Sequence, residues 1–135
     1  MAFGTFDGLH QGHLNFFKQA RKLASQPFLI VSVARDKNVA RIKGRRPFLN
    51  ERKRVILIKQ CPLVDKAILA GVKNHLFHIV REHPDIIALG YDQKAYVRNL
   101  RKDLKNKSIT VKIARLKPYK KSIYKNRLLK KRNLI

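Results

Sequence analysis

The sequence predicts an α/β fold, a three-layer α/β/α sandwich around a mainly parallel sheet of five strands. Short apolar runs alternate about five times with segments whose hydrophobic residues recur at helical spacing. The apolar runs are hydrophobic at successive positions, which is typical of parallel strands buried on both faces. Such strands need crossover connections, and helices are the usual ones. With 135 residues the chain has the length of one domain, so we expect residues 1–135 to form a single domain.

The first third of the chain predicts two strands and one helix. Residues 1–3 form a strand that is shorter than the usual five or so residues, because a glycine-rich stretch follows at once. Apolar residues at helical spacing predict an amphipathic helix over residues 13–25, which Pro27 ends. The continuous apolar run "FLIVSVA", residues 28–34, predicts the next strand.

The remaining elements follow from caps, prolines and apolar runs. Asn50 predicts the N-cap of a helix, with Glu51 well placed in its first turn. Asn74 predicts the cap of another helix, which ends before Pro84. The other predicted elements are strands over residues 63–69, 86–89 and 109–114, a helix over 94–106, and a basic C-terminal helix within 118–135 that Ser122 caps.

The charge of the chain is unusual. Lys and Arg number 32 against 8 Asp and Glu, which gives a formal charge of +24. Between Arg98 and Arg132 there are fifteen basic residues and one acid, Asp103. Such a surface attracts phosphate-bearing partners, which are small nucleotides, RNA or anionic lipid, although a basic run is equally often just a solvated face.

Two features that the sequence lacks limit the class of protein. No apolar run approaches the 18 or so residues that a membrane-spanning helix needs, so we expect no membrane partner. Cys61 is the single cysteine, which excludes a disulfide within the chain and suits a reducing compartment. We therefore expect a cytoplasmic protein.

Polar and small residues concentrate in two predicted loops. One loop follows the first strand and includes Gly4, Thr5, Phe6 and Asp7, and the other follows residues 86–89 and includes Gly90, Tyr91, Asp92 and Gln93. In open parallel sheets, ligands bind beyond the carboxyl ends of the strands, where the strand order reverses. The two loops are therefore expected to lie side by side at a ligand site.

The first loop has the chemistry of an anion site. Glycines let a backbone approach a bulky anion, and the helix that begins near Gly12 or His13 directs its free amides and positive dipole end at that anion. His10 and His13, three apart, lie on one side of the entering turn and are able to donate to phosphate oxygens. A His-x-x-His pair is also half of a metal site, but no neighbouring cysteine or carboxylate cluster completes one.

These residues carry a family resemblance. The stretch "GTFDGLHQGH" resembles the Gly-x-Phe-Asp-x-x-His-x-Gly-His signature of the cytidylyltransferase-like nucleotidyltransferases. The blocks "ARDKNV", "NERKRV", "VDKAIL" and "IALGYDQ" resemble those of archaeal-type FAD synthases, and glycerol-3-phosphate cytidylyltransferases are the nearest relatives with another substrate. The resemblance implies a Rossmann-like fold and transfer of a nucleoside monophosphate from a nucleoside triphosphate to a phosphorylated acceptor, with release of pyrophosphate. FMN adenylylation is favoured, and the choice of ATP over CTP depends on "ARDKNV" and "GYDQ" alone.

The resemblance also implies roles for single residues. His10, His13 and Arg54 would stabilise the triphosphate, and Asp92 and its neighbours would border the base and ribose. A basic residue of the loop that holds Lys43, Arg45 and Arg46 would also contact the triphosphate. Asp7 would hold Mg²⁺ or orient its loop. The remaining positions expected to bind nucleotide are Gly4, Thr5, Phe6, Gly12, Gly90, Ser122 and Lys125, although Ile123 and Tyr124 stand where relatives have threonines beside that serine.

The expected mechanism is direct in-line attack of the acceptor phosphate on the α-phosphorus. A phosphate nucleophile is already ionised, so the protein has to position the reactants and cancel negative charge, and Mg²⁺ is held mostly by the triphosphate. The alternative of another class is a catalytically degenerate module whose basic surface binds RNA, although few aromatic residues lie among its charges to stack bases. Homodimers are common in the family that the chain resembles, and no interface is evident in the sequence.

Overall fold

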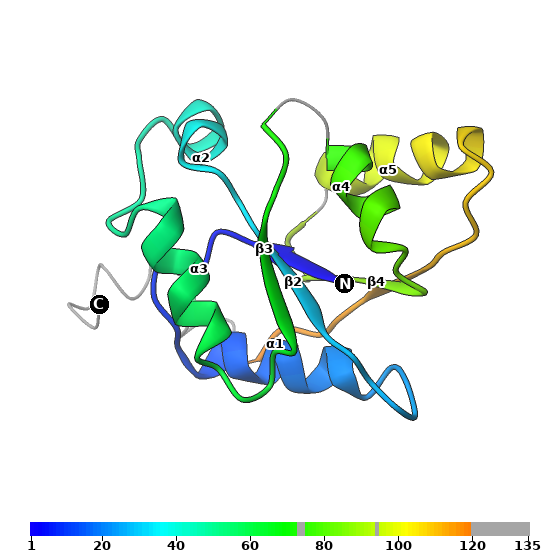
Figure 1. Ribbon diagram of the computed structural model, residues 1–135, viewed down its shortest axis with the longest axis horizontal. Coiled ribbons are helices and arrows are strands. Elements are labelled where there is room, and N and C mark those ends of the chain that lie inside the picture. The colour runs from blue at the N-terminus through cyan, green and yellow to red at the C-terminus, as the bar shows by residue number, and fades with distance from the viewer. Residues whose placement is uncertain (73–74, 94, 120–135) are drawn as a thin grey trace.

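The protein forms one parallel five-stranded sheet with helices on both faces (Figure 1). A computed structural model describes residues 1–72, 75–93 and 95–119. The strand order is β3-β2-β1-β4-β5, and every pair of neighbours is parallel, which confirms the predicted sheet. The strands are β1 (Ala2–Gly4), β2 (Ile30–Val33), β3 (Lys66–Leu69), β4 (Ile86–Leu89) and β5 (Lys112–Arg115), and the helices are α1 (Gln11–Arg21), α2 (Asp36–Lys43), α3 (Glu51–Lys59), α4 (His75–Glu82) and α5 (Ala95–Asn106).

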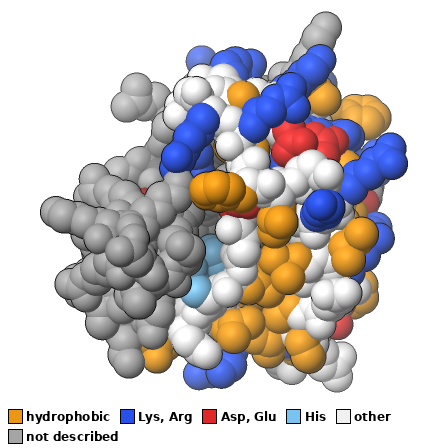
Figure 2. Space-filling model, turned by 90° about the vertical axis from the view of Figure 1, so that its left-hand side faces the viewer, with side chains coloured by type: hydrophobic (Ala, Val, Ile, Leu, Met, Phe, Trp, Pro, Cys, Tyr) orange, Lys and Arg blue, Asp and Glu red, His pale blue; other side chains and the backbone are white. Residues whose placement is uncertain are grey.

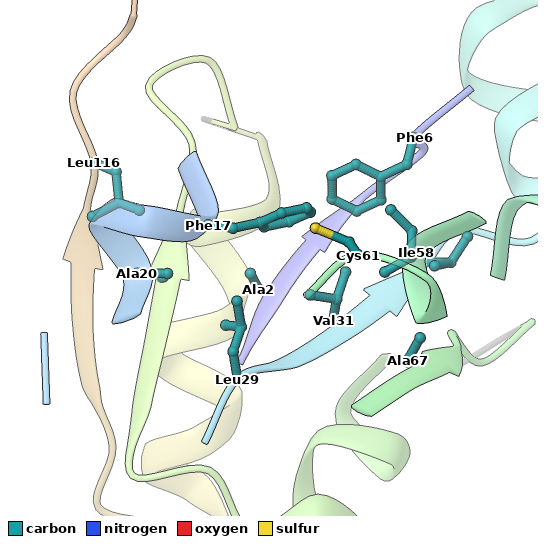
Figure 3. Close-up of a cluster of buried hydrophobic side chains, with 12 residues drawn as sticks. Ala2, Phe6, Phe17, Ala20, Leu29, Val31, Ile58, Cys61, Ala67 and Leu116 are labelled. Carbon is teal, nitrogen blue, oxygen red and sulfur yellow. The ribbon is translucent and has the colours of Figure 1, made fainter. Parts of the chain in front are cut away.

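Alternation along the strands makes the three layers. Side chains of a strand point to opposite faces in turn, so Ala2 packs in one hydrophobic cluster and its neighbour Phe3 packs in the other. The first cluster joins the sheet to α1 and α3 through side chains such as Phe17 and Ile58 (Figure 3). The second joins it to α4 and α5 through Ile79, Leu100 and Leu104, among others. This is the predicted three-layer arrangement.

The central strand β1 is short but well buried. It has three residues, as the sequence predicts, and all three pair with β2, with Ala2 opposite Val31. On its other side Ala2 lies opposite Ala88 of β4. The order of the strands along the chain reverses between β1 and β4. The loops that follow these two strands therefore meet at the place where open α/β sheets bind ligands.

Helix α2 was not predicted. Of its eight residues, Asp36–Lys43, only Asn38 and Val39 are buried. The helix therefore lacks the repeated apolar positions by which a longer helix is predicted from sequence. Gly44 ends it in the left-handed conformation, with φ of 79°. Lys43 is consequently the last residue of a helix, and the expectation that it lies in a loop is wrong. Residues 45 and 46 do lie between α2 and α3, and both are exposed.

Other boundaries shift by a few residues. Helix α1 begins at Gln11 and not at residue 13, because His10 caps it. The predicted cap at Asn50 is confirmed, since its Oδ1 accepts a hydrogen bond of 2.9 Å from the Lys53 amide. Ser122, Lys125, the predicted cap Asn74 and most of the predicted C-terminal helix lie outside the described residues. Among the helices that are described, none is long and apolar enough to cross a membrane.

Candidate active site

The segment from Gly4, the last residue of β1, through the loop of residues 5–10 is shaped by the ring of Phe6. Phe6 has a φ of 54°, which is rare for a bulky residue, and its side chain is only 4% exposed. The ring lies 5.4 Å from that of Phe17 and 5.3 Å, edge to face, from that of His13. The side chain of Phe6 is thus an anchor of the loop in the core, and only its backbone remains to face a ligand.

Gly4 and Gly8 are required by packing and by backbone conformation within the protein itself. A Cβ on Gly4 would lie 2.6 Å from Cζ of Phe6, so a side chain there would overlap the anchored ring. Gly8 has open space around it but a φ of 104°, which side chains strongly disfavour. The sequence had suggested close approach to an anion as their purpose. The structure instead shows packing for Gly4 and a turn for Gly8.

We expect Gly4→Ala to destabilise the protein by about 1–3 kcal/mol, since the buried Phe6 ring has no room to move away. Gly90→Ala is the matched control, because a Cβ at that strand end would meet Asp92 at 3.4 Å, an ordinary contact. Its effect should stay within about 1 kcal/mol. Urea denaturation of both variants gives the comparison, and equal losses would contradict the overlap argument.

His10 and His13 cap helix α1 together. The Nδ1 atom of His10 accepts a hydrogen bond from the His13 amide, and the Nδ1 atom of His13 accepts one from the His10 amide, both at 3.3 Å. This is a capping box in which two imidazoles take the parts usually played by a serine and a glutamate. Their rings stack, with centroids 3.8 Å apart and planes inclined by 17°.

The capping bonds determine how the two histidines are protonated. A nitrogen that accepts a hydrogen bond carries no proton, so both rings are neutral and carry their proton on Nε2. Burial lowers the pKa of His10, and burial followed by the neighbouring His10 lowers the pKa of His13 to about 3. At neutral pH each ring of the pair therefore carries an Nε2–H group and no positive charge. They stand beside the N-terminus of α1, where backbone amides also favour an anion.

This arrangement predicts a loss of stability in mild acid. Unfolded histidine binds a proton below its ordinary pKa of 6.5, whereas His13 in the native state stays neutral down to about 3. The free energy of unfolding should therefore fall as the pH drops from about 6.5 toward 3. His13→Gln keeps an N3 acceptor for the capping box and removes the titration. Urea denaturation at about pH 7.5 and about pH 5 should show a smaller pH effect in this variant, and an unchanged effect would contradict the assignment.

Asp7 ties the loop after β1 to the segment between α2 and α3. Its Oδ2 accepts the amide of Phe48 at 2.7 Å and its Oδ1 accepts that of Leu49 at 2.8 Å. Both carboxylate oxygens thus have a structural task, which favours loop orientation over the alternative of metal binding. The described residues contain no cluster of three His, Cys, Asp or Glu side chains that would hold a metal ion. They do not fit a magnesium site built from protein ligands alone.

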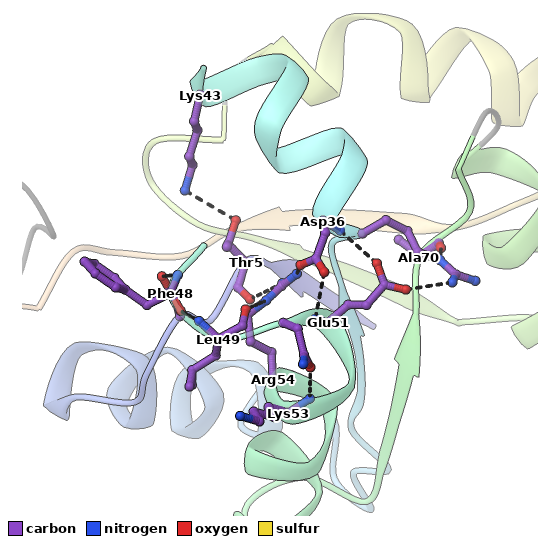
Figure 4. Close-up of polar contacts among 12 residues, drawn as sticks. Thr5, Asp36, Lys43, Phe48, Leu49, Glu51, Lys53, Arg54 and Ala70 are labelled. Atoms are coloured by element: carbon purple, nitrogen blue, oxygen red, sulfur yellow. Dashed lines mark hydrogen bonds and ion pairs between the residues drawn. The ribbon is translucent and has the colours of Figure 1, made fainter. Parts of the chain in front are cut away.

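Arg54 is buried against the loop after β1 and is not exposed at the surface of the protein. Its side chain is 0% exposed, and it donates to the backbone oxygen of Thr5 at 2.8 Å and that of Leu49 at 3.0 Å. A third bond, of 2.7 Å, reaches the Asp36 carboxylate (Figure 4). The expected direct contact with phosphates does not agree with this burial. In the structure Arg54 is a positioning residue that joins α2, α3 and the loop after β1.

The acids around Arg54 extend the same network. Glu51 accepts from the Asp36 amide at 2.9 Å and pairs with Arg35 at 3.0 Å, and Arg35 donates to the Ala70 oxygen after β3. Burial raises the pKa of Asp36, but bonds from Arg54 and the Glu51 amide outweigh it, so this pKa lies below its ordinary value. Asp36 is thus held as an anion under the buried guanidinium.

The loop after β4 is fastened to β1 and β5. Gln93 donates to the Phe3 oxygen of β1 at 2.9 Å and accepts the Gly90 amide at 2.7 Å, which ties the loop after β4 to the neighbouring strand β1. Arg115, at the end of β5, donates to the Gly90 oxygen at 2.8 Å. Asp92 is exposed. Gln93 belongs to the loop that the sequence predicts at the ligand site, whereas Arg115 was not predicted. Arg115 reaches this loop because the β4–β5 register sets it opposite Leu89, the last residue of β4.

Lys43 completes the site from the side of α2. Its Nζ donates to the Thr5 hydroxyl at 3.3 Å, so an ammonium group stands over the loop after β1. Thr5, Asp7, Gly12 and the two histidines therefore gather at the carboxyl end of β1, with Lys43 on the β2 side and the loop of Gly90 and Asp92 on the β4 side. Neutral donors, helix amides and a cation around one loop suit the binding of a phosphate chain.

Comparison with known proteins identifies the family. The family model described as cytidylyltransferase-like matches residues 1–127. The chain belongs to the cytidylyltransferase-like family. Relatives named FAD synthase include that of Aciduliprofundum boonei, 42% identical over 120 residues that make up 88% of this chain and 78% of the relative. That of Methanothermus fervidus is 44% identical over 124 residues, 90% of this chain and 84% of the relative.

A solved structure shares the fold of this cytidylyltransferase-like chain. It is described as the lipopolysaccharide core biosynthesis protein from Thermoplasma volcanium, and its TM-score is 0.80 at 41% sequence identity. The match covers 88% of this chain and 95% of the other. The Rossmann-like fold that the resemblance implied is therefore confirmed.

Proposed function

We propose that this cytidylyltransferase-like protein is an FAD synthase, which transfers AMP from ATP to FMN and releases pyrophosphate. The names of its relatives support this reaction, since proteins called FAD synthase are 41–44% identical over most of their length. The observation that carries the assignment in the structure is the paired imidazoles, whose two Nε2–H donors stand at the N-terminus of α1. An anion-binding site of this form suits the triphosphate of a nucleotide.

The sheet topology suggests how ATP binds. Its phosphates take the N-terminus of α1, near His10, His13 and Lys43, and its base and ribose take the loop after β4, which includes Asp92. The strand order reverses between β1 and β4, so this orientation lays the nucleotide across the crevice at the switch point.

The chemical step needs no general base from the protein. An ionised phosphate oxygen of FMN attacks the α-phosphorus of ATP, a new P–O bond forms, and the bond from the α-phosphorus to the bridging oxygen breaks. Pyrophosphate leaves with the electrons of that bond, and FAD is the other product. Negative charge grows on the α-phosphate and on the leaving group. Donors that are already oriented, such as the two imidazoles, stabilise this charge without reorganisation.

Magnesium enters this proposal with the substrate. The described residues do not offer a protein-held site, and ATP carries oxygens of its own for the ion. We therefore propose ATP–Mg²⁺ as the form that binds, with Asp7 keeping its structural bonds to Phe48 and Leu49.

The direct test is pyrophosphate release with four substrate pairs: ATP or CTP, each with FMN or glycerol 3-phosphate. We expect turnover with ATP and FMN, and FAD as the product by chromatography. Turnover only with CTP and glycerol 3-phosphate would replace FAD synthesis by cytidylyl transfer. No pyrophosphate release with any of the four pairs, together with RNA binding that weakens steeply with salt, would favour the basic binding module and overturn the enzymatic proposal.

A further inference from the structure

The turn after β4 is bound by a side chain of the neighbouring strand β5. Residues 90–93 form this turn, and the Gln93 amide donates to the Gly90 oxygen across it at 3.2 Å. The Nη1 atom of Arg115 donates to the same Gly90 oxygen at 2.8 Å and lies 3.4 Å from the Tyr91 oxygen. The Nη2 atom lies 3.5 Å from the Gln93 oxygen. One guanidinium thus gathers three backbone oxygens of a single turn.

The backbone of Arg115 is held in place by the sheet. Arg115 is the last residue of β5, and it lies opposite Leu89, the last residue of β4. The next residue, Leu116, donates its amide to the Leu89 oxygen at 2.8 Å, which extends the ladder beyond the strand. The side chain of Arg115 therefore starts beside the first residue of the turn.

The turn is fastened from two sides that differ in their relation to the proposed site. Gln93 ties it to Phe3 of β1, on the side of the crevice. Arg115 ties it to β5, which lies on the side of β4 away from β1. Arg115 consequently supports the turn from the side opposite to the crevice and does not face a nucleotide that lies there.

Arg115 is exposed, so its bonds contribute little to the stability of the whole fold. An exposed turn opens locally at a much lower free energy than the core. Bonds that keep such a turn ordered act mainly on ligand binding, because a site that is already ordered loses less conformational freedom when its ligand binds.

The shape of the guanidinium matters here more than its charge. Lys and Arg number 32 against 8 acids, and Figure 2 shows them at several places on one face of the molecule. One cation among so many adds little to the attraction of an anion. A guanidinium has five donors in a rigid plane and reaches several oxygens at once, whereas the ammonium of lysine is a point charge on a flexible stem.

We propose that Arg115 is a positioning residue of the nucleotide site, which holds the turn of residues 90–93 in the orientation that receives the base and ribose of ATP. This inference rests on the proposed synthesis of FAD and adds a residue that acts through the turn, without contact to the substrate. Arg115 should therefore affect the affinity for ATP, and neither the affinity for FMN nor the rate of the chemical step.

The kinetic test compares Arg115→Met and Arg115→Lys with Lys112→Met. We expect Arg115→Met to raise KM for ATP roughly fivefold to thirtyfold, with kcat and KM for FMN within about twofold of the wild type. Arg115→Lys keeps the charge but reaches fewer oxygens, so its KM for ATP should lie between those of Arg115→Met and the wild type. Lys112→Met is the matched control, because it removes an exposed cation from the other end of β5. It should leave all three constants unchanged.

Stability and hydrogen exchange separate a local effect from a global one. The urea midpoint of Arg115→Met should stay close to that of the wild type, while amide exchange in residues 90–93 of the ligand-free protein should become faster. A midpoint lowered as far as that of Arg54→Met, or unchanged exchange in the turn, would overturn the positioning role. A wild-type KM for ATP in Arg115→Lys would attribute the effect to charge and would overturn it as well.

Direct binding distinguishes this inference from the proposed function. Calorimetric titration with a non-hydrolysable ATP analogue and Mg²⁺ should show weaker binding by Arg115→Met, by about the same factor as the change in KM. FAD synthesis by the wild type, with unchanged analogue affinity in Arg115→Met, would remove the role of Arg115 and leave the proposed function intact. A wild type that neither forms FAD nor binds the analogue would contradict both.

Discussion

Replacing His10 by Asn, or His13 by Gln, should lower kcat by about two to three decades while the fold persists. Each change removes an Nε2–H donor, and loss of one oriented donor to a developing charge costs about a hundredfold to a thousandfold in other enzymes. Each new side chain still has an oxygen to accept the capping bond, because Asn is a favoured N-cap and Gln suits N3. The measurement is single-turnover and steady-state FAD formation with ATP and FMN.

Alanine at the same positions separates catalysis from capping. His10→Ala loses the donor and the cap, so its unfolding free energy should fall by about 1 kcal/mol below that of His10→Asn, with similar activity. If His10→Asn and His13→Gln kept their rates within about threefold of the wild type, the imidazoles would have no part in the chemistry. The site would then have to be sought elsewhere.

Arg54→Met should cause the largest loss of stability in the chain, about 3–5 kcal/mol. The change leaves the half-buried Asp36 carboxylate with the Glu51 amide but without its cation, and it removes the buried donors to the oxygens of Thr5 and Leu49. Because these bonds hold the loop after β1, we expect activity to fall along with stability. Chemical denaturation followed by circular dichroism measures the first effect.

Two variants test the cause of that loss. Arg52→Met removes the same charge from an exposed position of the same helix α3, and it should change stability by no more than about 0.5 kcal/mol. Combining Arg54→Met with Asp36→Asn should cost less than the sum of the two single changes, because the unpaired anion is gone. Strict additivity would show that the buried pair does not account for the effect.

The parts of the fold that the sequence predicts are those with strong local signals. Residues 86–89 are apolar at every position and form β4 with those bounds, and Asn50 begins α3 as a cap should. Helix α2 was not predicted because it has few apolar residues of its own. Its start depends on Asp36 and Glu51, which bond to each other's amides across the chain.

Some features of the candidate site were likewise predicted from the sequence, and others were not. The adjacency of the loops after β1 and β4 follows from the strand order, and a hydrogen bond from Gln93 to Phe3 holds the loop after β4 against β1. The roles of Arg54 and Phe6 did not follow, because a motif tells which residues occur together and not which way they face. Burial of Arg54 requires Asp36 from another helix, and the inward ring of Phe6 requires a positive φ.

The reciprocal bonds of His10 and His13 make the active site and the first turn of α1 one cooperative unit. Each ring accepts a hydrogen bond from the backbone amide of the residue that carries the other ring. Fraying of that turn would disorient both rings together, and an anion bound at their Nε2–H groups would in turn protect the turn's amide hydrogens from exchange with solvent. If the proposed site binds its substrate there, binding and the ordering of this turn reinforce each other.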